Sequence, residues 1–297
     1  MGDGVETEEA VNIRDAKFDP EGKVAVITGA AGGIGLGMAR AFTDAGMSVV
    51  IADIDADRIE ATASELRDAG HDAVGVQTDV SKLDEVQALA DAAMDTHGRV
   101  DVLCNNAGAA VFAKLFNVTV DDWEWTLGVD LWGPIYGTKV FQPLIQQSET
   151  GGHINTTSSV SGLVAGAAAG PYNVAKSGVI ALMATLEREF RIAKSPHRAS
   201  VLCPGPINTD ISRNSVRNRK ASKGEVAVAG DAGKKLGSKM NDFLSNGMDP
   251  ADVGKIVLDG IMTGRFWMFT HPKLLKLYQE QIDLMDPDGS LSQGRLA

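Results

Sequence analysis

Short runs of apolar, mostly β-branched residues recur along the chain, and segments with helical spacing of their apolar positions separate them. In chain order the runs are VAVIT, SVVIAD, AVGVQTD, VDVLCNN, GHINTTSS, RASVLCPG and RFWMFT. Continuous apolar runs of this length predict strands that are buried on both faces of a sheet. We therefore expect a single-domain α/β fold, a doubly wound parallel sheet of seven strands with the Rossmann architecture.

The intervening segments carry helix signals. The segment ADRIEATASELRDAG places Ile59, Ala63 and Leu66 on one face, which is typical of an amphipathic helix. A longer helix is expected from about Val120 to Gln147, with an interruption near Gly133–Pro134.

Two stretches depart from this alternation. Residues 1–22 are acidic and lack an apolar pattern, so we expect a flexible arm before a domain that spans 23–297. Residues 208–249 are polar, basic and punctuated by glycines. Because they follow the sixth strand, we expect them to form a substrate lid at the sheet edge where ligands bind.

The composition of the chain argues against several classes of partner and site. The formal net charge of −11 argues against nucleic acid and against an anionic membrane surface as partners. No apolar run approaches the ~18 residues that a membrane span needs. The only two cysteines, Cys104 and Cys203, end separate apolar runs, so neither a disulfide framework nor a metal site is expected. Since the acidic N-terminus does not resemble a signal peptide, we expect a cytoplasmic protein.

The turn TGAAGGIG lies between the first strand and the first helix. Its glycines, spaced as Gly29-x-x-x-Gly33-x-Gly35, let the backbone turn tightly and let a diphosphate approach the helix N-terminus. The alternative is a turn that needs glycine only for its backbone angles. The position directly after the first buried strand favours a dinucleotide site. Its candidate contacts are Gly29, Ala31, Gly32, Gly33, Ile34 and Gly35.

Asp53 ends the second strand. An acid at this point of a doubly wound fold accepts hydrogen bonds from the adenosine ribose hydroxyls, and it repels the 2′-phosphate of NADP. The turn contains no Arg or Lys, and Asp53 is followed by Ile54, so NAD is the expected cofactor. The alternative is that Asp53 caps the N-terminus of the following helix.

Four further motifs follow in order: NNAG (105–108), SS (158–159), YNVAK (172–176) and PGPINT (204–209). Together with the glycine turn they resemble the short-chain dehydrogenase/reductase family, from about Lys23 to Thr270. Within that family the C-terminal half is most similar to bacterial enzymes that oxidise benzylic Cα alcohols of lignin-type aryl ethers. The resemblance implies a small-molecule alcohol or ketone as the substrate.

Tyr172 and Lys176 are one helical turn apart, so the ammonium group can stabilise a phenolate. The resemblance implies that Tyr172 is the acid/base, that Lys176 also binds the nicotinamide ribose, and that Ser159 hydrogen-bonds the reacting oxygen. The alternative is an ordinary helix surface with two amphipathic side chains. The resemblance also implies further cofactor contacts, at Asp79, Val80, Asn106, Ala107, Gly108, Thr157, Pro204, Gly205, Ile207 and Thr209.

One position departs from the family pattern. The family usually has asparagine in a VNLxG context, whereas this chain reads VDLWG and has Asp130. The asparagine is thought to hold a water in a proton relay. An aspartate can accept a hydrogen bond from that water, and it should find a cationic partner in Lys176. Either the chain tolerates the carboxylate, or the carboxylate changes the titration of Tyr172.

Two other functions remain open. The first is an NADPH-dependent ketoreductase that acts on acyl substrates, and the second is a non-catalytic dinucleotide-sensing protein. Basic residues of the lid favour the first weakly, because they could meet phosphates, but a solvated lid surface is the preferred interpretation. These residues are Arg213, Arg217, Arg219, Lys220 and Lys223. His271, after the last strand, is a candidate for the substrate pocket, and a bulky apolar or aromatic secondary alcohol is the expected substrate.

A long apolar stripe also runs along the helix expected over 171–193. It comprises Val174, Val179, Met183, Leu186 and Phe190. Because this stripe is longer than one sheet should cover, we expect a homo-oligomer, a dimer or a tetramer.

Overall fold

The computed structural model describes residues 17–223 and 241–283. Its centre is a seven-stranded sheet in the order β3-β2-β1-β4-β5-β6-β7, and every neighbouring pair of strands is parallel. The strands are β1 (Val24–Thr28), β2 (Ser48–Asp53), β3 (Ala73–Gln77), β4 (Val102–Asn105), β5 (His153–Thr157), β6 (Arg198–Cys203) and β7 (Trp267–Phe269). The predicted doubly wound fold is confirmed.

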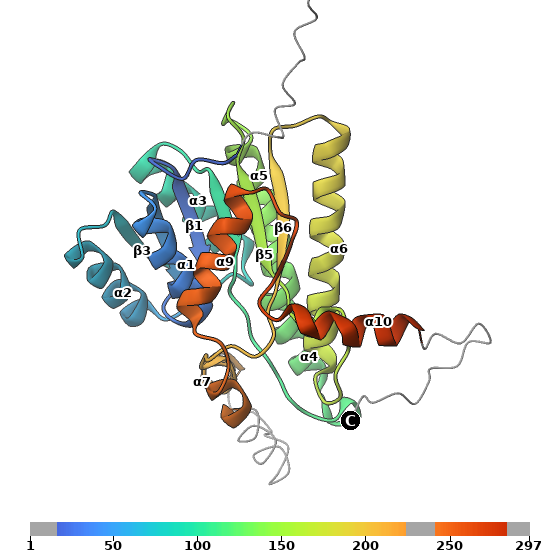
Figure 1. The fold of residues 1–297 in the computed structure, drawn as a ribbon. Coiled ribbons are helices and arrows are strands. Elements are labelled where there is room, and N and C mark those ends of the chain that lie inside the picture. The colour runs from blue at the N-terminus through green and yellow to red at the C-terminus, as the bar shows by residue number, and fades with distance from the viewer. Residues whose placement is uncertain (1–16, 224–240, 284–297) are drawn as a thin grey trace, which may run out of the picture.

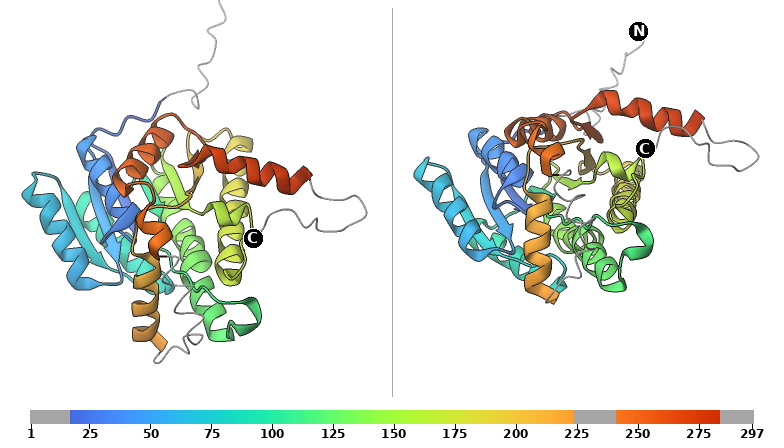
Figure 2. Two further views of the ribbon diagram at one scale, coloured as in Figure 1. Left: turned by 60° about the horizontal axis from the view of Figure 1, so that its bottom comes forward. Right: turned by 90° about the horizontal axis from the view of Figure 1, so that it is seen from below.

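Helices cover both faces of the sheet (Figure 1). One apolar core joins it to α1 (Gly33–Asp44), α2 (Ala56–Asp68) and α9 (Pro250–Met262). The other core joins it to α3 (Leu83–His97), α5 (Gly133–Ile145) and α6 (Gly170–Ile192). Two further helices, α4 (Val120–Leu127) and α7 (Ile211–Lys223), lie near the carboxyl ends of the strands, and α10 (Leu275–Asp283) follows β7 (Figures 1 and 2).

Strand β1 lies between β2 and β4, so the direction of strand progression reverses at β1. The carboxyl ends of parallel strands on the two sides of such a reversal leave a crevice, and ligands bind there. The glycine turn leaves β1 at this point and leads into α1. The topology therefore places the predicted dinucleotide turn at the usual ligand site of the fold.

The predicted helix interruption lies slightly earlier in the chain than expected. A π-helical segment, η3 (Gly128–Trp132), joins α4 to α5, and Pro134 lies in the first turn of α5. Proline is well accommodated there, because the first turn of a helix has unpaired N–H groups in any case. The wider π turn contains Asp130. The residue that differs from the family's usual asparagine therefore lies where the α-helix is interrupted.

The expected lid is only partly a loop. Residues 211–223 form α7, and residues 241–245 are also helical, whereas residues 224–240 lie outside the described residues. The sequence did not predict α7, because the residues that this helix buries are polar and form no apolar helical pattern. These positions are Ser212, Ser215 and Arg219.

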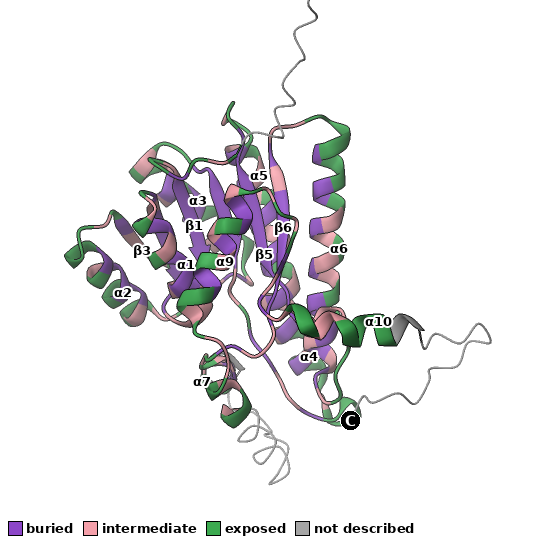
Figure 3. Cartoon of the chain, viewed as in Figure 1, coloured by how far each residue is buried: buried purple, intermediate pink, exposed green. Residues whose placement is uncertain are grey.

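The basis of the oligomer prediction was wrong. Val179, Met183, Leu186 and Phe190 are all buried against the sheet of the same chain, and only Val174 is exposed, at 50%. Figure 3 shows α6 buried on the side that faces the sheet and exposed on the other. The apolar core of the same chain therefore covers most of the stripe.

Within the described ranges, no helix combines the length and apolar character of a membrane crossing. Those residues also contain no group of three or more His, Cys, Asp or Glu side chains that could hold a metal ion. Both cysteines are free and buried.

Candidate active site

A cavity of about 550 Å³ opens at the carboxyl edge of the sheet, around the strand reversal at β1. Most of the predicted site residues line it, although they come from six different strand-to-helix connections. They are Gly29, Ala31, Gly32, Gly33, Ile34, Asp53, Ile54, Asp79, Val80, Asn106, Ala107, Gly108, Thr157, Tyr172, Lys176, Pro204 and Thr209.

The other five predicted residues lie outside the lining: Gly35, Asp130, Ser159, Gly205 and Ile207. A Cβ at Gly35 would collide with the Gly29 carbonyl, so this glycine permits close packing of α1 on the turn. Gly205 packs against His271 and donates its N–H to Thr270 Oγ1 at 3.0 Å. Ile207 is buried in the core beside α1 and α9. These three support the walls of the cavity from behind.

His271, the substrate-pocket candidate, also lies outside the large cavity. Its Nδ1 is 2.7 Å from Thr270 Oγ1, and its ring faces a small apolar gap beneath α10. The strand order accounts for this, because β7 is the edge strand, remote from the reversal at β1.

The glycine turn is held close to β4. Gly29 has φ +66°, and a Cβ there would lie 2.7 Å from the Cα of Ala107. The Asn106 amide fastens the same contact: its Nδ2 donates to the Thr28 carbonyl at 3.0 Å, and its Oδ1 accepts from Thr157 Oγ1 at 3.1 Å. Glycine is therefore required at position 29 by backbone angle and by space. Asn106 ties together the ends of β1, β4 and β5.

Asp53 does not cap a helix. The cap of α2 is Asp55, whose carboxylate accepts from the Arg58 N–H at 3.2 Å. Asp53 lines the cavity and accepts hydrogen bonds from the N–H groups of Ala31 and Asp55, both at 3.2 Å. The alternative reading of Asp53 as a helix cap is thus wrong, and its carboxylate faces the side of the cavity next to the glycine turn.

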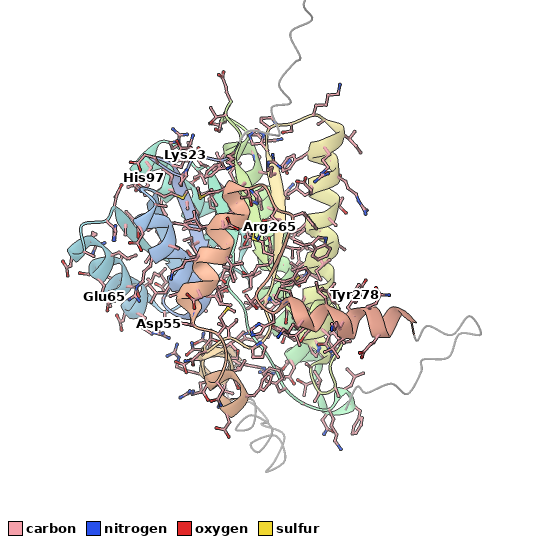
Figure 4. All side chains as sticks on the ribbon, in the orientation of Figure 1. Lys23, Asp55, Glu65, His97, Arg265 and Tyr278 are labelled. Atoms are coloured by element: carbon pink, nitrogen blue, oxygen red, sulfur yellow. The ribbon has the colours of Figure 1, made fainter. Side chains whose placement is uncertain are left out.

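Two arginines that the sequence analysis did not place at the cofactor site also line this end of the cavity. Arg58, in the first turn of α2, donates from Nη2 to the Ala31 carbonyl at 3.2 Å. Arg217 of α7 reaches Asp55, with 3.1 Å between Nη2 and Oδ2. Figure 4 labels Asp55 at the end of the sheet nearest to α7. A basic residue five positions after Asp53 was a signal that could have identified Arg58.

Tyr172 and Lys176 lie in the first two turns of α6, on the far wall of the cavity. Lys176 is only 2% exposed, its Nζ donates to the Thr157 carbonyl at 3.0 Å, and Nζ lies 5.5 Å from the centre of the Tyr172 ring. An ordinary helix-surface lysine would be solvated, so that alternative is wrong for Lys176. Burial and the nearby Asp130 charge raise the pKa of Tyr172, and its hydrogen bond with Ser159 acts in the opposite direction.

Asp130 lies directly behind Lys176 and is fully buried. Its Oδ1 accepts from the Ala109 N–H at 2.7 Å and lies 3.9 Å from Lys176 Nζ, the expected cationic partner. Its Oδ2 has no hydrogen-bond partner among the described residues. Burial raises the pKa of Asp130 to about 6, although Lys176 and the Ala109 hydrogen bond lower it.

Helix α7 lines the cavity and contacts three different segments of the chain. Ser215 Oγ accepts from the Ala110 N–H at 2.9 Å, Arg217 pairs with Asp55, and Arg219 Nη2 lies 2.6 Å from Asp122 Oδ1 of α4. The prediction of a solvated basic surface is therefore wrong for Arg219, which is 7% exposed. Arg213 pairs with Asp210 at the surface, and the side chains of Lys220 and Lys223 lie outside the described residues.

Comparison with known proteins identifies the family of this chain. The family model described as short chain dehydrogenase matches residues 23–220. The chain belongs to the short-chain dehydrogenase family. It is 31% identical to a Cα-dehydrogenase of Sphingobium sp. over 93% of this chain and 90% of the relative. It is 30% identical to the 1-deoxy-11-beta-hydroxypentalenate dehydrogenase of Streptomyces exfoliatus over 88% of this chain and 87% of the relative.

Solved structures agree with this short-chain dehydrogenase assignment. A short-chain dehydrogenase/reductase from Burkholderia phymatum, solved in complex with NAD, superposes with a TM-score of 0.88. The two chains are 33% identical, with 93% of this chain and 98% of the other covered. The protein is thus an oxidoreductase of this family.

The residues of this short-chain dehydrogenase suit a dinucleotide. The close approach at Gly29 and the start of α1 at Gly33 leave backbone N–H groups next to the cavity, where a diphosphate is favoured. The Asp53 carboxylate offers acceptors at one end of the same cavity, and Lys176 offers a donor at the other. Ribose hydroxyl groups can bind to both.

Proposed function

We propose that this protein is an NAD-dependent dehydrogenase that transfers hydride between a secondary alcohol and the nicotinamide, with Tyr172 as the acid/base. The observation that carries the proposal is the buried Lys176, held by Thr157 with its Nζ 5.5 Å from the Tyr172 ring, in the wall of a dinucleotide-sized cavity. The Thr157 carbonyl and the Asp130 carboxylate offset the cost of burying Lys176, and they hold a positive charge beside the tyrosine, which supports a role in catalysis.

Tyr172 needs a positive charge near its hydroxyl group to act as a base. Burial and Asp130 raise the pKa of Tyr172 in the protein alone, so the phenol is protonated at neutral pH. The bound cofactor would accept the hydride and would add a positive charge beside the phenol in its oxidised form. Together with Lys176, that charge favours the phenolate. Tyr172 then takes the proton of the substrate hydroxyl group at its Oη.

Ser159 positions the phenol of Tyr172 and the reacting oxygen of the substrate. Its hydrogen bond with Tyr172 lowers the pKa of Tyr172 and orients the phenol. Its hydroxyl group also accepts from the Ser161 N–H at 3.1 Å, which fixes the oxygen at the start of the short helix η4 (Val160–Gly162). Such a fixed donor can hydrogen-bond the substrate oxygen while it becomes a carbonyl oxygen. Asp130 Oδ2, which has no partner among the described residues, can accept a hydrogen bond from a relay water behind Lys176.

The cofactor preference rests on Asp53. Its carboxylate faces the cavity next to the glycine turn, where it would accept from the adenosine ribose hydroxyls and repel a 2′-phosphate. The NAD complex of the Burkholderia relative supports NAD as the cofactor here. Arg58 and Arg217 favour the NADPH-dependent alternative, and Asp53 opposes it.

The proposed substrate is a bulky apolar or aromatic secondary alcohol. The names of two relatives, a Cα-dehydrogenase and a hydroxypentalenate dehydrogenase, support an alcohol on a large apolar skeleton. The test is a panel of secondary alcohols, benzylic and alicyclic, each offered with NAD⁺ and with NADP⁺ while absorbance reports the reduced cofactor. Turnover of a bulky alcohol with NAD⁺ supports the proposal. The absence of turnover with every alcohol, despite cofactor binding, would favour the dinucleotide-sensing alternative.

We also propose a cytoplasmic homo-oligomer, a dimer or a tetramer. The support is exposed apolar side chains on three helical segments: Val120 of α4 at 71%, Trp132 of η3 at 49% and Val174 of α6 at 50%. Exposed large apolar side chains mark an interface where they form one patch. Light scattering at micromolar concentration tests this, and the mass of a single chain would contradict it.

A further inference from the structure

His271 lies outside the large cavity, but its neighbour Thr270 joins it to the segment that forms one cavity wall. Strands β6 and β7 are paired in parallel up to Cys203 and Phe269, so the residues that follow them lie side by side. There Thr270 Oγ1 accepts from the Gly205 N–H at 3.0 Å and lies 2.7 Å from His271 Nδ1. A hydroxyl group can accept and donate at once, so Thr270 can serve both partners.

The His271 ring also packs directly on Gly205. A Cβ at Gly205 would lie 2.7 Å from Nδ1 and 2.9 Å from Cγ of the ring, and 3.0 Å from Leu274 Cδ1. Gly205 is therefore held from two sides, by the hydrogen bond of its N–H group and by the imidazole against its Cα. Thr270 is only 6% exposed, so water competes little for this hydrogen bond.

The residue before Gly205 joins two walls of the candidate active site. Pro204 lines the cavity, and its carbonyl accepts from the Val160 N–H at 3.0 Å. Val160 directly follows Ser159, the proposed partner of the substrate oxygen. The segment 204–209 is expected to hold the nicotinamide, so one carbonyl group ties that segment to the backbone next to Ser159.

We propose that His271 is a positioning residue for hydride transfer, which acts through Thr270 and Gly205. Together they hold the segment 204–209 in register with Ser159. The inference rests on the proposed dehydrogenase function and goes beyond it, because it gives the end of the edge strand β7 a part in the reaction. Hydride transfer needs the reacting atoms in close contact, and a misplacement of about 1 Å can cost about 10²-fold in rate.

The first test removes the hydroxyl group that joins the two partners. Thr270→Val has nearly the same shape but can neither accept from Gly205 nor donate to His271, whereas Thr270→Ser keeps both bonds. In alcohol oxidation with NAD⁺, Thr270→Val should reduce kcat by about tenfold or more, and Thr270→Ser should stay near the wild type. The deuterium isotope effect on kcat, measured with alcohol labelled at the carbinol carbon, should rise in Thr270→Val. The reason is that hydride transfer becomes slower relative to cofactor release.

Substitutions of His271 test the ring itself. His271→Leu removes the nitrogen beside Thr270 and should lower kcat as Thr270→Val does. His271→Asn can place its amide oxygen near the position of Nδ1 and should keep most of the rate. The matched control is His71→Leu, because His71 pairs with Asp44 at 3.5 Å and lies outside the cavity lining. Thermal unfolding of each variant checks that the fold persists.

Hydrogen exchange of the NADH complex measures the same hold without any alcohol. Peptides that cover 204–209 and 159–163 should exchange faster in Thr270→Val and in His271→Leu. They should exchange at the wild-type rate in Thr270→Ser. If the wild type oxidises no alcohol, faster exchange in these variants still supports the hold on 204–209, and the dehydrogenase proposal alone fails.

Two results would overturn the proposal. One is unchanged kcat, isotope effect and exchange in both Thr270→Val and His271→Leu, which would reject only the role of His271 if the wild type oxidises alcohols. The other is a Thr270→Ser variant as slow as Thr270→Val, or a His271→Asn variant as slow as His271→Leu. In that case the hydrogen bonds that the conservative variants keep would not set the rate.

Discussion

The Asp130 carboxylate and the Lys176 ammonium group face each other inside the protein, with 3.9 Å between Oδ1 and Nζ. Both side chains are almost fully buried. Lys176 lowers the pKa of Asp130, which burial raises to about 6. The carboxylate in turn raises the pKa of Tyr172. Asp130 therefore opposes the effect expected of Lys176, and the pH dependence of catalysis should reveal it.

Asp130→Asn should move the rising limb of the pH–rate profile for alcohol oxidation to lower pH, by about one unit. The sign follows from charge: the asparagine removes an anion that raises the pKa of Tyr172, so the phenol ionises more easily. Below about pH 6 the wild-type carboxyl group is protonated, and the two profiles should converge there. The measurement is kcat against pH for both proteins with saturating cofactor and substrate.

The control for this comparison is Asp259→Asn, because Asp259 of α9 pairs at the surface with Arg265, which Figure 4 labels. Its profile should match that of the wild type. An unshifted profile in Asp130→Asn would mean that the chain simply tolerates the carboxylate. A complete loss of activity would give Asp130 a role of its own as a proton carrier.

Tyr172→Phe should reduce kcat by about 10²–10⁴-fold, the usual contribution of general acid–base catalysis. NADH binding should survive, because Lys176 remains held by the Thr157 carbonyl. The matched control is Tyr136→Phe, since Tyr136 packs on Trp132 outside the cavity lining. Steady-state kinetics and a fluorescence titration with NADH check both parts. Retention of a tenth of the activity would remove Tyr172 from its role as the base.

The sequence predicted the features that depend on residues close together in the chain. Strands β1 and β2 begin and end where expected, because a strand buried on both faces must be apolar throughout. The glycine turn was recognised because a backbone contact such as that of Gly29 with Ala107 leaves no room for a side chain. Asp53 ends β2, as the sequence predicted, because the apolar run stops at this residue.

The features that the sequence did not predict depend on contacts between distant segments. Arg217 is far from Asp53 in the chain, and only the course of α7 across the cavity brings it near. Helix α7 buries serines and an arginine, so no apolar period marks it. The stripe on α6 is apolar, as predicted. Whether the sheet of the same chain buries it depends on how far the sheet extends beside α6, and sequence periodicity does not show that.

Gly254→Ala should destabilise the protein by about 1–3 kcal/mol, the usual cost of overpacking. Helices α1 and α9 meet at glycines, and a Cβ at Gly254 would collide with the Gly37 carbonyl and lie 2.9 Å from the Met38 nitrogen. Backbone atoms cannot move aside as a flexible side chain can. The control is Gly166→Ala, where a Cβ would meet no atom within 4 Å. Equal unfolding midpoints in urea for the two variants would contradict the prediction.

Arg219→Met should loosen α7 while the sheet stays folded. The Arg219–Asp122 pair is buried, with side chains only 8% and 10% exposed, and polar contacts replace an apolar face under this helix. Loss of one partner leaves the Asp122 charge uncompensated, and such a loss costs up to about 3–5 kcal/mol in buried pairs. Asp122 still accepts from the N–H and hydroxyl groups of Thr119, so we expect the lower part of that range.

Hydrogen exchange of the α7 peptide and the dissociation rate of NADH measure this loosening. Both should rise in Arg219→Met, because α7 forms part of the cavity wall that would hold a bound dinucleotide. Limited proteolysis within 208–249 should also become faster, and cofactor with substrate should slow it. Arg213→Met is the matched control, since Arg213 pairs with Asp210 at the surface, where an ion pair contributes about 0–1 kcal/mol. If the two variants exchange and release NADH at equal rates, the Arg219–Asp122 pair does not hold α7 over the cavity.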